Sequence, residues 1–354
     1  MKVILATGIY PPEIGGPATY VKALAGALMK QGTEVKVITY GGSNDDPWDV
    51  INVRKGIYPI CRWFRYARAL KKHAANADAV YAFSSVSVGI PVMLAKLKCK
   101  KILRLGGDFF WERYTDRGGE KNLREWHESK PFSRGFMGLI LSKFDHVVFS
   151  TKLQEEIYEN NSKSLPKHSV IENAIPDDFK WSDHIRREPF RLLAMSRLVR
   201  FKNLESLVRA VPLMPSEILL TIIGDGPRKN SLQNLVHKLN LDGRVAFTEP
   251  IHGKDKQLIF DMHEVLISPS FTDISPNVAL EAVSAGLPVL ITKETGLSKE
   301  LTKGMALSDL RTPEQIANAV KEIYDNYPKL EKSHLPDRSW GIVAEETLKL
   351  FKSL

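Results

Sequence analysis

Residues 268–288, SPSFTDISPNVALEAVSAGLP, decide the fold of this chain. The apolar run 265–267 just before them is typical of a buried strand, and the polar residues 273–277 form a turn after it. Residues 278–285 then have helical spacing and end at a glycine, after which the next apolar run begins. This order predicts a strand, a turn and a helix whose positive end lies at the carboxyl edge of a parallel sheet. Open α/β sheets bind anionic ligands at that edge.

Two acids mark this stretch: Asp273 lies in the turn, and Glu281 lies two helical turns further on. Because they are eight residues apart, both carboxylates can point toward one ligand. A second interpretation is equally open, in which Asp273 caps the helix and Glu281 is a solvated surface residue.

Length and composition bound the remaining possibilities. The 354 residues suggest two domains of ordinary size. Cys61 and Cys99 are too few for a disulfide framework and lack the spacing of a metal site, which favours a reducing compartment. Residues 1–12 suit a first buried strand better than a signal peptide, and there is no apolar run of about 20 residues to span a membrane. We therefore expect a cytoplasmic protein.

The net charge of +9 comes entirely from the first half. Residues 1–172 hold 26 Lys and Arg against 17 Asp and Glu, whereas residues 173–354 hold 24 of each. A basic half of this kind suggests an anionic surface or substrate as its partner.

The basic centre is residues 54–73, RKGIYPICRWFRYARALKKH, where cations and aromatic residues alternate. After Pro59 this stretch can form a helix with a basic side (Arg62, Arg65, Arg68 and Lys72), while Ile60, Phe64, Ala67 and either Leu70 or Lys71 turn to another side. An amphipathic helix packed on a sheet explains the pattern. A basic helix with aromatic residues also favours an anionic membrane surface. No nucleic-acid recognition module is visible, so we expect no nucleic-acid partner.

Strand and helix patterns alternate through the first half, which predicts a parallel sheet covered on both faces. The apolar runs lie at residues 3–6, 34–40, 79–83, 101–105, 146–150 and 169–171. After the first run, Gly15 and Gly16 precede a helix predicted at 19–29. A glycine pair lets the backbone approach a phosphate closely, although a flexible loop explains it as well.

The loop after the run 101–105 reads GGDFFWE and carries Asp108 and Glu112. Two glycines and an acid at the end of a strand indicate a loop that faces a site, and a simple Gly-Asp turn is the alternative. His127 stands in a polar stretch and indicates no special role.

In the second half, the polar residues 173–189 predict an interdomain linker. Arg197 and Lys202 then stand between a strand at 190–195 and a helix that begins at Leu204. Two cations beside a helix start would hold a diphosphate, whereas two solvated cations would explain the pattern equally. Further runs at 219–223 and 245–247 end in GDGP and TEPI.

Together these features resemble the retaining family 4 glycosyltransferases of the GT-B fold. Gly-Gly after the first strand, Arg-x4-Lys, Gly-Asp-Gly-Pro, and an acid-x7-Glu before Ala-x3-Gly-x-Pro follow the family's order over nearly the whole chain. The resemblance implies an α/β protein of two Rossmann-like parallel-sheet domains that face each other across a cleft. Residues 1–172 with 340–354 would form the acceptor-side domain, and 173–339 the donor domain.

The resemblance also implies a nucleotide diphosphate sugar as donor, a UDP- or GDP-sugar, with no metal and no further cofactor required. Arg197 and Lys202 match the cationic pair at the diphosphate, Asp273 matches the first acid, at the sugar, and Glu281 matches the acid that binds the ribose. The expected catalytic set is Asp108, Asp273, Arg197 and Lys202. The other expected donor contacts are Gly15, Gly16, Gly224, Glu249, Pro250, Ile251, Ile274, Ser275, Asn277 and Val278.

Two positions depart from the family pattern. The family usually has Glu followed by Gly-Phe-Gly where this chain has Asp273 followed by Ile-Ser-Pro. Aspartate is one methylene shorter, and Pro276 has no N–H to donate, so Asn277 is expected to replace that donor. Many members also have a histidine in the loop where this chain has Asp108. We expect Asp108 to take the place of that histidine.

The expected reaction is transfer of a hexosyl group with retention to a glycan or a lipid-linked acceptor. The basic residues 54–73 would place the enzyme peripherally at the inner face of a membrane. A sugar-nucleotide epimerase of the same fold, and a binding protein that has lost turnover, remain alternatives.

Overall fold

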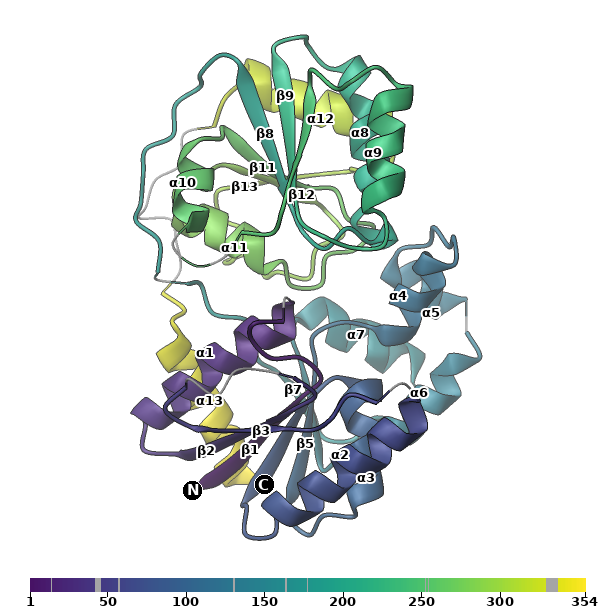
Figure 1. Ribbon diagram of the computed structural model, residues 1–354, viewed down its shortest axis with the longest axis vertical. Coiled ribbons are helices and arrows are strands. Elements are labelled where there is room, and N and C mark those ends of the chain that lie inside the picture. Colours follow the sequence, from purple (N-terminus) through teal and green to yellow (C-terminus); the bar gives the residue numbers. More distant parts are fainter. Residues whose placement is uncertain are drawn as a thin grey trace. The chain divides into compact units, whose positions relative to one another are not determined.

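The computed structural model describes residues 1–13, 15–41, 46–56, 58–129, 131–162, 164–176, 178–251, 253, 255–328 and 337–354. They form two compact units (Figure 1). Unit 1 comprises Met1–Phe110, Trp126–Ala174 and Arg338–Leu354, and unit 2 comprises Trp111–Glu125 and Ile175–Asp337. Among the helices of these residues, none combines the length and the apolar character that crossing a membrane requires.

Unit 1 is built on a parallel sheet in the order β3-β2-β1-β4-β5-β6-β7. The central strands β1, β4 and β5 are buried along most of their length, as a sheet covered on both faces requires. The strands are β1 (Lys2–Thr7), β2 (Glu34–Thr39), β3 (Asp49–Asn52), β4 (Ala79–Phe83), β5 (Lys100–Leu105), β6 (His146–Phe149) and β7 (His168–Val170).

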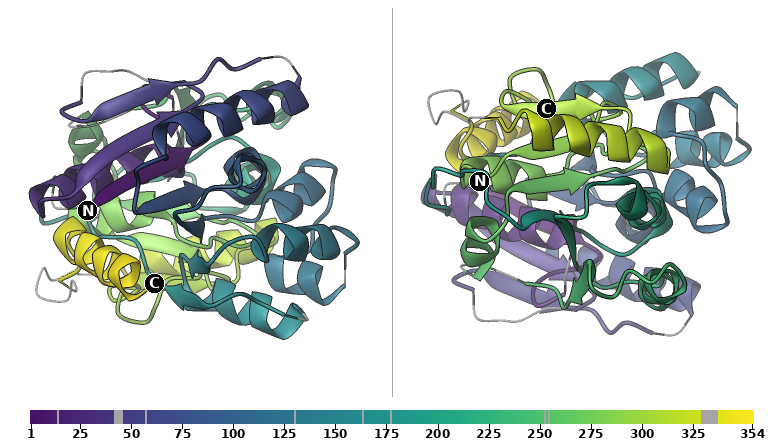
Figure 2. Two further views of the ribbon diagram at one scale, coloured as in Figure 1. Left: turned by 90° about the horizontal axis from the view of Figure 1, so that it is seen from below. Right: turned by 90° about the horizontal axis from the view of Figure 1, so that it is seen from above.

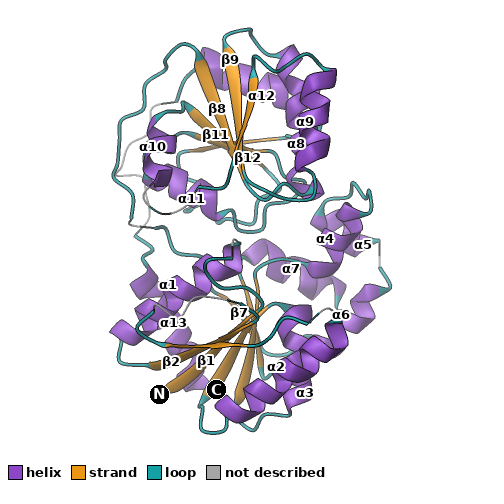
Figure 3. Cartoon of the chain, in the orientation of Figure 1, coloured by secondary structure: helices purple, strands orange, loops and turns teal. Residues whose placement is uncertain are grey.

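Helices cover both faces of this sheet (Figures 2 and 3). They are α1 (Gly16–Lys30), α2 (Pro59–His73), the π-helix η1 (Ser85–Gly89), α3 (Ile90–Ala95), α6 (Ser133–Leu141), α7 (Lys152–Asn161) and α13 (Trp340–Ser353). The last helix, α13, packs on α1 and the strands: the Trp340 ring lies 5.1 Å from that of Tyr20, and Phe351 lies 5.4 Å from Tyr81. The end of the chain therefore completes the core of unit 1.

Unit 2 is built on a second parallel sheet in the order β10-β9-β8-β11-β12-β13. Its strands are β8 (Phe190–Met195), β9 (Ile218–Ile223), β10 (Val245–Thr248), β11 (Val265–Ser268), β12 (Val289–Thr292) and β13 (Met305–Ser308). One apolar cluster joins the sheet to α8 (Leu204–Ala210), α9 (Lys229–Lys238) and α12 (Pro313–Asp325). Another joins it to α10 (Asp255–Asp261) and α11 (Asn277–Ser284). Short 3-10 turns, η2 (Arg200–Lys202) and η3 (Val211–Leu213), flank α8.

Residues 111–125 lie with unit 2, although the predicted boundary assigned them to the first domain. They carry most of α4 (Phe109–Asp116) and the start of α5 (Leu123–Glu128). The buried Trp111 ring packs 5.2 Å from Phe201, and the backbone N–H of Leu123 donates to Thr272 Oγ1 at 2.9 Å. The segment therefore contacts Phe201 of η2, after β8, and Thr272, after β11. No feature of the composition predicted these contacts.

The predicted linker, residues 173–189, is an ordered segment for most of its described length. The backbone N–H of Ser182 donates to the Ala285 carbonyl at 3.0 Å, and Arg187 Nε donates to the buried Glu264 Oε1 at 2.8 Å. From residue 175 the segment therefore packs against unit 2.

The faces of α2 differ from the predicted ones. Ala67 and Leu70 are buried as expected, together with Tyr66, whose hydroxyl donates to the Thr7 carbonyl at 2.9 Å. Ile60 and Phe64, which were expected on the packed side, are 62% and 59% exposed. The first turns of α2 thus present apolar and basic side chains on one solvent-facing surface.

Candidate active site

The candidate site residues of unit 2 gather where its parallel strands end. Ser196 follows β8, Gly224 follows β9, Glu249 follows β10 and the turn around Asp273 follows β11. The strand order β10-β9-β8-β11 makes these four strand ends neighbours. The sheet therefore brings together residues that are up to 77 positions apart in the chain.

Close backbone contact between two turns positions Arg197. Gly224 has φ +149°, and a Cβ atom there would lie 1.9 Å from the Ser196 carbonyl oxygen. Gly226 has φ +155°, and its Cβ would lie 2.6 Å from the Leu198 carbonyl oxygen. The N–H of Leu198 donates to the Asp225 carbonyl at 2.8 Å. Gly224, predicted as a donor contact, is thus required first for packing of the Arg197 turn.

The Arg197 guanidinium is half exposed and contacts Glu112 Oε2 at 3.2 Å. Both residues belong to unit 2. An exposed ion pair of this kind contributes little to stability, so its cation can exchange the carboxylate for another anion.

Lys202 and Asp273 form the centre of the site. Lys202 Nζ lies 3.1 Å from Asp273 Oδ1 and 3.0 Å from Oδ2. The hydroxyls of Ser268 and Ser270 donate to Asp273 Oδ2 at 2.8 and 3.0 Å. Asp273 is 5% exposed, and its backbone is fixed because its N–H donates to the Glu294 carbonyl at 3.0 Å. The structure therefore does not use Asp273 as a helix cap: α11 is preceded by Pro276, with no side-chain cap.

Glu281 is not a solvated helix residue. It is 7% exposed, and its Oε2 accepts from Lys256 Nζ of α10 at 2.6 Å. A carboxylate about one turn into α11 is thus buried against Lys256. The sequence did not single out Lys256, since no pattern distinguishes it from other surface lysines.

The neighbouring predicted contacts are placed as follows. Glu249 is exposed and paired with Lys229, and Pro250 and Ile251 are half-buried. Ile274 is buried, and Asn277 and Val278 begin α11 half-buried. Ser275 Oγ is buried and has no hydrogen-bond partner among the described residues. A buried hydroxyl of this kind gains free energy when a ligand supplies its hydrogen bond.

Chemically, this edge holds three cations, Arg197, Lys202 and Lys256, each facing one carboxylate. Phosphate oxygens can replace a carboxylate on a cation, and a displaced buried carboxylate then needs other hydrogen-bond donors. The two buried acids, Asp273 and Glu281, can then accept hydrogen bonds from ligand hydroxyls. The arrangement suits a ligand that carries both phosphate and diol groups.

In unit 1, Gly15 and Gly16 lie at the start of α1, which begins three residues earlier than predicted because Pro17 is tolerated in a first helical turn. A Cβ on Gly15 would lie 2.6 Å from Ile9 Cδ1, and its carbonyl accepts from the N–H of Ala18 at 3.0 Å. Gly16 is exposed. Their contact with a phosphate stays a prediction.

Asp108 lies in a buried network of unit 1. It is 1% exposed; Oδ2 lies 2.9 Å from His127 Nε2, and the Tyr158 hydroxyl donates to it at 2.8 Å. The N–H of Phe110 donates to Oδ1 at 3.1 Å. Burial, and then the charge and hydrogen bond of Asp108, raise the pKa of Tyr158, so its hydroxyl stays protonated and donates. His127, which the sequence gave no reason to notice, is a structural partner of Asp108.

The space beside this network is small. His127 Nδ1 is buried without a partner among the described residues, and the adjoining hollow, which Arg134 and Ser133 also line, measures about 10 Å³. This volume is at the threshold for one water molecule. Asp108 therefore has neither the exposure nor the space that direct contact with a sugar would need in this conformation.

One group of unit 1 has the composition of a metal site. One ligand atom from each of Glu155, Glu159 and His168 lies within 4.8 Å of the others. Lys152 already neutralises Glu155, and His168 Nε2 lies 3.1 Å from Glu159 Oε1, so internal pairs account for these groups.

The comparisons with known proteins agree with this reading of unit 2. Residues 177–334 match the family model described as glycosyl transferases group 1. The matched region covers somewhat less than half of the chain and lies within the unit that carries Arg197, Lys202, Asp273 and Glu281. With glycosyltransferase relatives that align over nearly the whole chain, this match shows that the protein is a glycosyltransferase.

Relatives extend the similarity over the whole chain. An uncharacterised glycosyltransferase of Methanocaldococcus jannaschii is 26% identical over 99% of this chain and 98% of its own length. The alpha-monoglucosyldiacylglycerol synthase of Streptococcus pneumoniae is 23% identical over 98% of this chain and 83% of its own length.

Solved structures show the GT-B fold. The sucrose-phosphate synthase of Thermosynechococcus elongatus has a TM-score of 0.82 at 19% identity and covers 99% of this chain and 98% of its own. Anabaena HepE in complex with UDP-glucose has a TM-score of 0.78 at 14% identity and covers both chains fully, at 100% each. The predicted fold class, two Rossmann-like parallel-sheet domains of the GT-B type, is confirmed.

Proposed function

We propose that this glycosyltransferase transfers a hexosyl group, with retention, from a nucleotide diphosphate sugar to an acceptor. The observation that carries the proposal is the pair of buried acids eight residues apart, Asp273 and Glu281, each held by its own lysine at the carboxyl edge of the sheet. A phosphorylated ligand with diol groups matches this charge pattern, and a nucleotide sugar has both.

The donor diphosphate binds Arg197 and Lys202, whose present partners are carboxylates that a phosphate can replace. Glu281 accepts hydrogen bonds from the two ribose hydroxyls, because a carboxylate binds a diol in bidentate fashion. Asp273 and the buried Ser275 hydroxyl contact the sugar, which offsets the donor that Pro276 lacks. The bound cations stabilise the departing diphosphate, so the step does not depend on a metal ion.

The placement of Asp273 supports the proposal of retention. Asp273 is engaged by Lys202, Ser268 and Ser270, so it is a poor nucleophile toward the sugar. The leaving phosphate then accepts the proton of the acceptor hydroxyl on the face from which it departs. Because the bond to the diphosphate breaks on the face where the acceptor bond forms, the anomeric configuration is kept.

The base and the sugar of the donor are set at residues 249–251 and 273–278. We propose a UDP-sugar as the first donor to test, since HepE, a protein of the same fold, was solved with UDP-glucose. The alternatives are a GDP-sugar, an epimerase reaction that needs no acceptor, and binding without turnover.

The deciding experiment follows release of nucleoside diphosphate from a panel of UDP- and GDP-sugars, with and without a lipid or glycan acceptor. Acceptor-dependent release is expected, and Lys202→Ala and Glu281→Ala should each lower it about 100-fold or more, since each removes a charged contact to the donor. Lys238→Ala, on the exposed end of α9, is the matched control. Near-normal turnover in both variants would remove the donor-site assignment, and an altered donor without an acceptor would favour the epimerase.

We also propose a lipid-linked or glycan acceptor, presented at an anionic membrane surface through residues 54–73. The S. pneumoniae relative is named as a synthase of a glycosylated diacylglycerol. The exposed Ile60 and Phe64 share the solvent-facing surface of α2 with Arg65 and Arg68. Flotation with anionic liposomes should show binding that salt reverses and that the double change Ile60→Ser with Phe64→Ser abolishes. Equal binding to neutral liposomes, or none at low salt, would contradict this part.

A further inference from the structure

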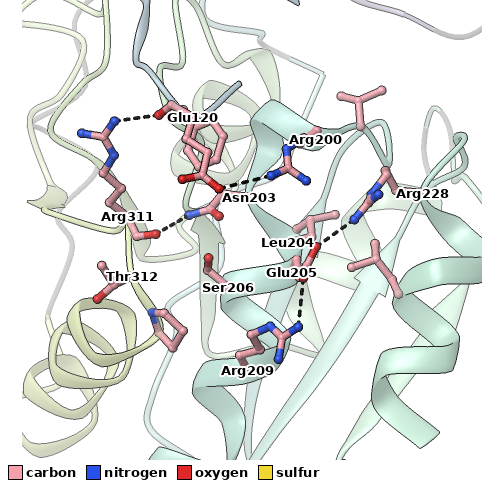
Figure 4. A pocket seen from close by; sticks show the side chains of 14 residues that line it. Glu120, Arg200, Asn203, Leu204, Glu205, Ser206, Arg209, Arg228, Arg311 and Thr312 are labelled. Carbon is pink, nitrogen blue, oxygen red and sulfur yellow. Dashed lines mark hydrogen bonds and ion pairs between the residues drawn. The ribbon is translucent and has the colours of Figure 1, made fainter. Parts of the chain in front are cut away.

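A polar cavity lies in unit 2, and it shares none of its lining with the donor residues. Its volume is about 370 Å³, within the range of small-molecule sites. Among its lining are four arginines, shown in Figure 4: Arg200, Arg209, Arg228 and Arg311. The acids of the lining are Glu120 and Glu205.

The cavity has more cationic than anionic groups. Glu205 lies between two arginines: Arg209 Nη2 is 3.0 Å from Oε1 and Arg228 Nη2 is 2.8 Å from Oε2 (Figure 4). The hydrogen bond from Arg209, and the charges of Arg228, Arg209 and Arg200, lower the pKa of the Glu205 carboxyl. Four arginines against two lining carboxylates leave two positive charges in excess. Glu125, which pairs with Arg311 from outside the cavity, reduces the excess to one.

The pairs that hold these arginines can open. The Glu120 side chain, 3.2 Å from Arg200, is 74% exposed, and Glu205 and Arg228 are 39% and 34% exposed. Arg200 Nε is buried and has no hydrogen-bond partner among the described residues. An anion that enters the cavity therefore finds donors that exposed, exchangeable carboxylates hold only weakly.

The base of the cavity is rigid and polar. Asn203 Nδ2 donates to the carbonyls of Leu310 and Arg311 at 2.9 and 3.1 Å and joins η2 to the loop before α12. Thr312 forms a reciprocal cap with Gln315, which fixes the start of α12. Ser206 adds a hydroxyl beside these groups. The lining thus offers donors for a phosphate on one side and hydroxyl partners on the other.

We propose that this arginine cavity binds a small phosphate monoester with several hydroxyl groups, separately from the donor nucleotide sugar. A phosphate monoester carries close to two negative charges at neutral pH, and a lining of four arginines against two carboxylates gives it net positive surroundings. Arginine is well suited to a planar, bidentate grip on phosphate. The volume exceeds the needs of a bare phosphate ion and accommodates the ester's carbon skeleton. Because η2 carries both Arg200 and Lys202, the ester lies one short turn away from the donor lysine.

The test measures binding of glucose 6-phosphate and of inorganic phosphate to the full chain by calorimetry at constant ionic strength. Saturable one-to-one binding of the ester, tighter than that of phosphate, is expected. Arg228→Ala and Arg209→Ala should each weaken it about tenfold or more, since each removes a charge-assisted hydrogen bond. Lys238→Ala, an exposed cation elsewhere on unit 2, should bind within about twofold of wild type.

Three outcomes overturn the proposal. The first is the absence of saturable binding, and the second is wild-type affinity in Arg228→Ala and Arg209→Ala with normal melting curves. The third is competition by UDP together with loss of ester binding in Lys202→Ala, which would assign the ester to the donor site. Equal affinity for phosphate and for the ester would also overturn the ester assignment, because the ligand would then be the free phosphate ion. If Arg228→Ala fails to fold, Arg228→Lys, which keeps the charge, is measured in its place.

The result can be separated from that of the proposed function. UDP-sugar binding should stay within about twofold of wild type in Arg228→Ala, because no donor residue lines the cavity. Ester binding without donor turnover would contradict the transferase proposal alone, and turnover without ester binding would contradict this inference alone.

Discussion

Two acidic loops of this chain look alike in sequence and differ in structure. Asp273 follows strand β11 in unit 2, and Asp108 follows strand β5 in unit 1. Both are almost fully buried, at 5% and 1% exposure. Asp273 is bonded to a lysine and two serine hydroxyls, whereas Asp108 is bonded to the imidazole of His127 and the hydroxyl of Tyr158.

The partners decide what each acid can do. A ligand phosphate can bind Lys202 in place of Asp273, because the Ser268 and Ser270 hydroxyls still donate to the displaced carboxylate. No ligand can take over His127 and Tyr158 from Asp108 without leaving buried donors unpaired, at a cost of about 1–3 kcal/mol for each group. An acid at the end of a strand is therefore a ligand contact only where its partner can be exchanged.

The largest expected effect concerns the turn of unit 2 that carries Arg197. Gly224→Ala should lower the free energy of unfolding by about 3 kcal/mol, because its Cβ would meet the Ser196 carbonyl oxygen at 1.9 Å in a backbone conformation that favours glycine. The Arg197 turn must then move, so donor binding should fall with stability. Denaturant unfolding and UDP titration measure the two effects.

Gly243→Ala is the matched control, because nothing lies within 4 Å of a Cβ built there and its φ is not positive. It should leave both quantities unchanged. A Gly224→Ala variant that kept wild-type stability would show that the Ser196 contact does not hold the turn.

The central strands could be predicted from the sequence, and two of the four edge strands could not. Strands such as β4 and β12 are fully buried, so their residues form continuous apolar runs. The two missed strands, β3 and β13, lie at sheet edges and are short and partly exposed. The other edge strands, β7 and β10, were predicted although they are short and partly exposed as well. An edge strand buries few side chains, so its pattern is weak.

The site divides in the same way. Asp273, Glu281, Arg197 and Lys202 could be singled out because local strand–turn–helix patterns and the family resemblance pointed to them. Lys256 was not singled out, and Glu112 was singled out in its own loop but not as the partner of Arg197, since both reach these residues from other parts of the chain. Long-range pairing has no local signature, which is also why the His127 network stayed hidden.

The second prediction tests the unit 1 side of the comparison. Asp108→Asn should lower the free energy of unfolding by about 2 kcal/mol, because an amide has one acceptor oxygen where the carboxylate uses two. If that oxygen faces His127 and Tyr158, the NH2 group opposes the N–H of Phe110. If Asp108 is structural, kcat per folded enzyme should stay within a few-fold of wild type. Thermal unfolding and transfer kinetics on the folded fraction measure the two quantities.

Asp116→Asn, an exposed aspartate at the end of α4, serves as the matched control and should change neither quantity. A drop in kcat of about 100-fold with an unchanged melting temperature would return Asp108 to the catalytic role that the sequence suggested.

The smallest expected effect is the dependence of stability on pH that a buried neutral histidine causes. His263 of unit 2 is 4% exposed; burial lowers its pKa, and the charges of Arg191 and Arg187 lower it further. At pH values above the ordinary histidine pKa, both the folded and the unfolded states are neutral, and stability is complete. As the pH falls below about 6.5, the unfolded chain takes up the proton first, so the folded state loses stability.

Unfolding curves at pH 7.5 and 5.5 should therefore show a decrease that His263→Gln reduces and that His237→Gln, on an exposed face of α9, leaves intact. His146 of unit 1, whose pKa burial also lowers, accounts for a remaining share of the decrease. An identical loss of stability in the His263→Gln variant would mean that protonation elsewhere destabilises unit 2.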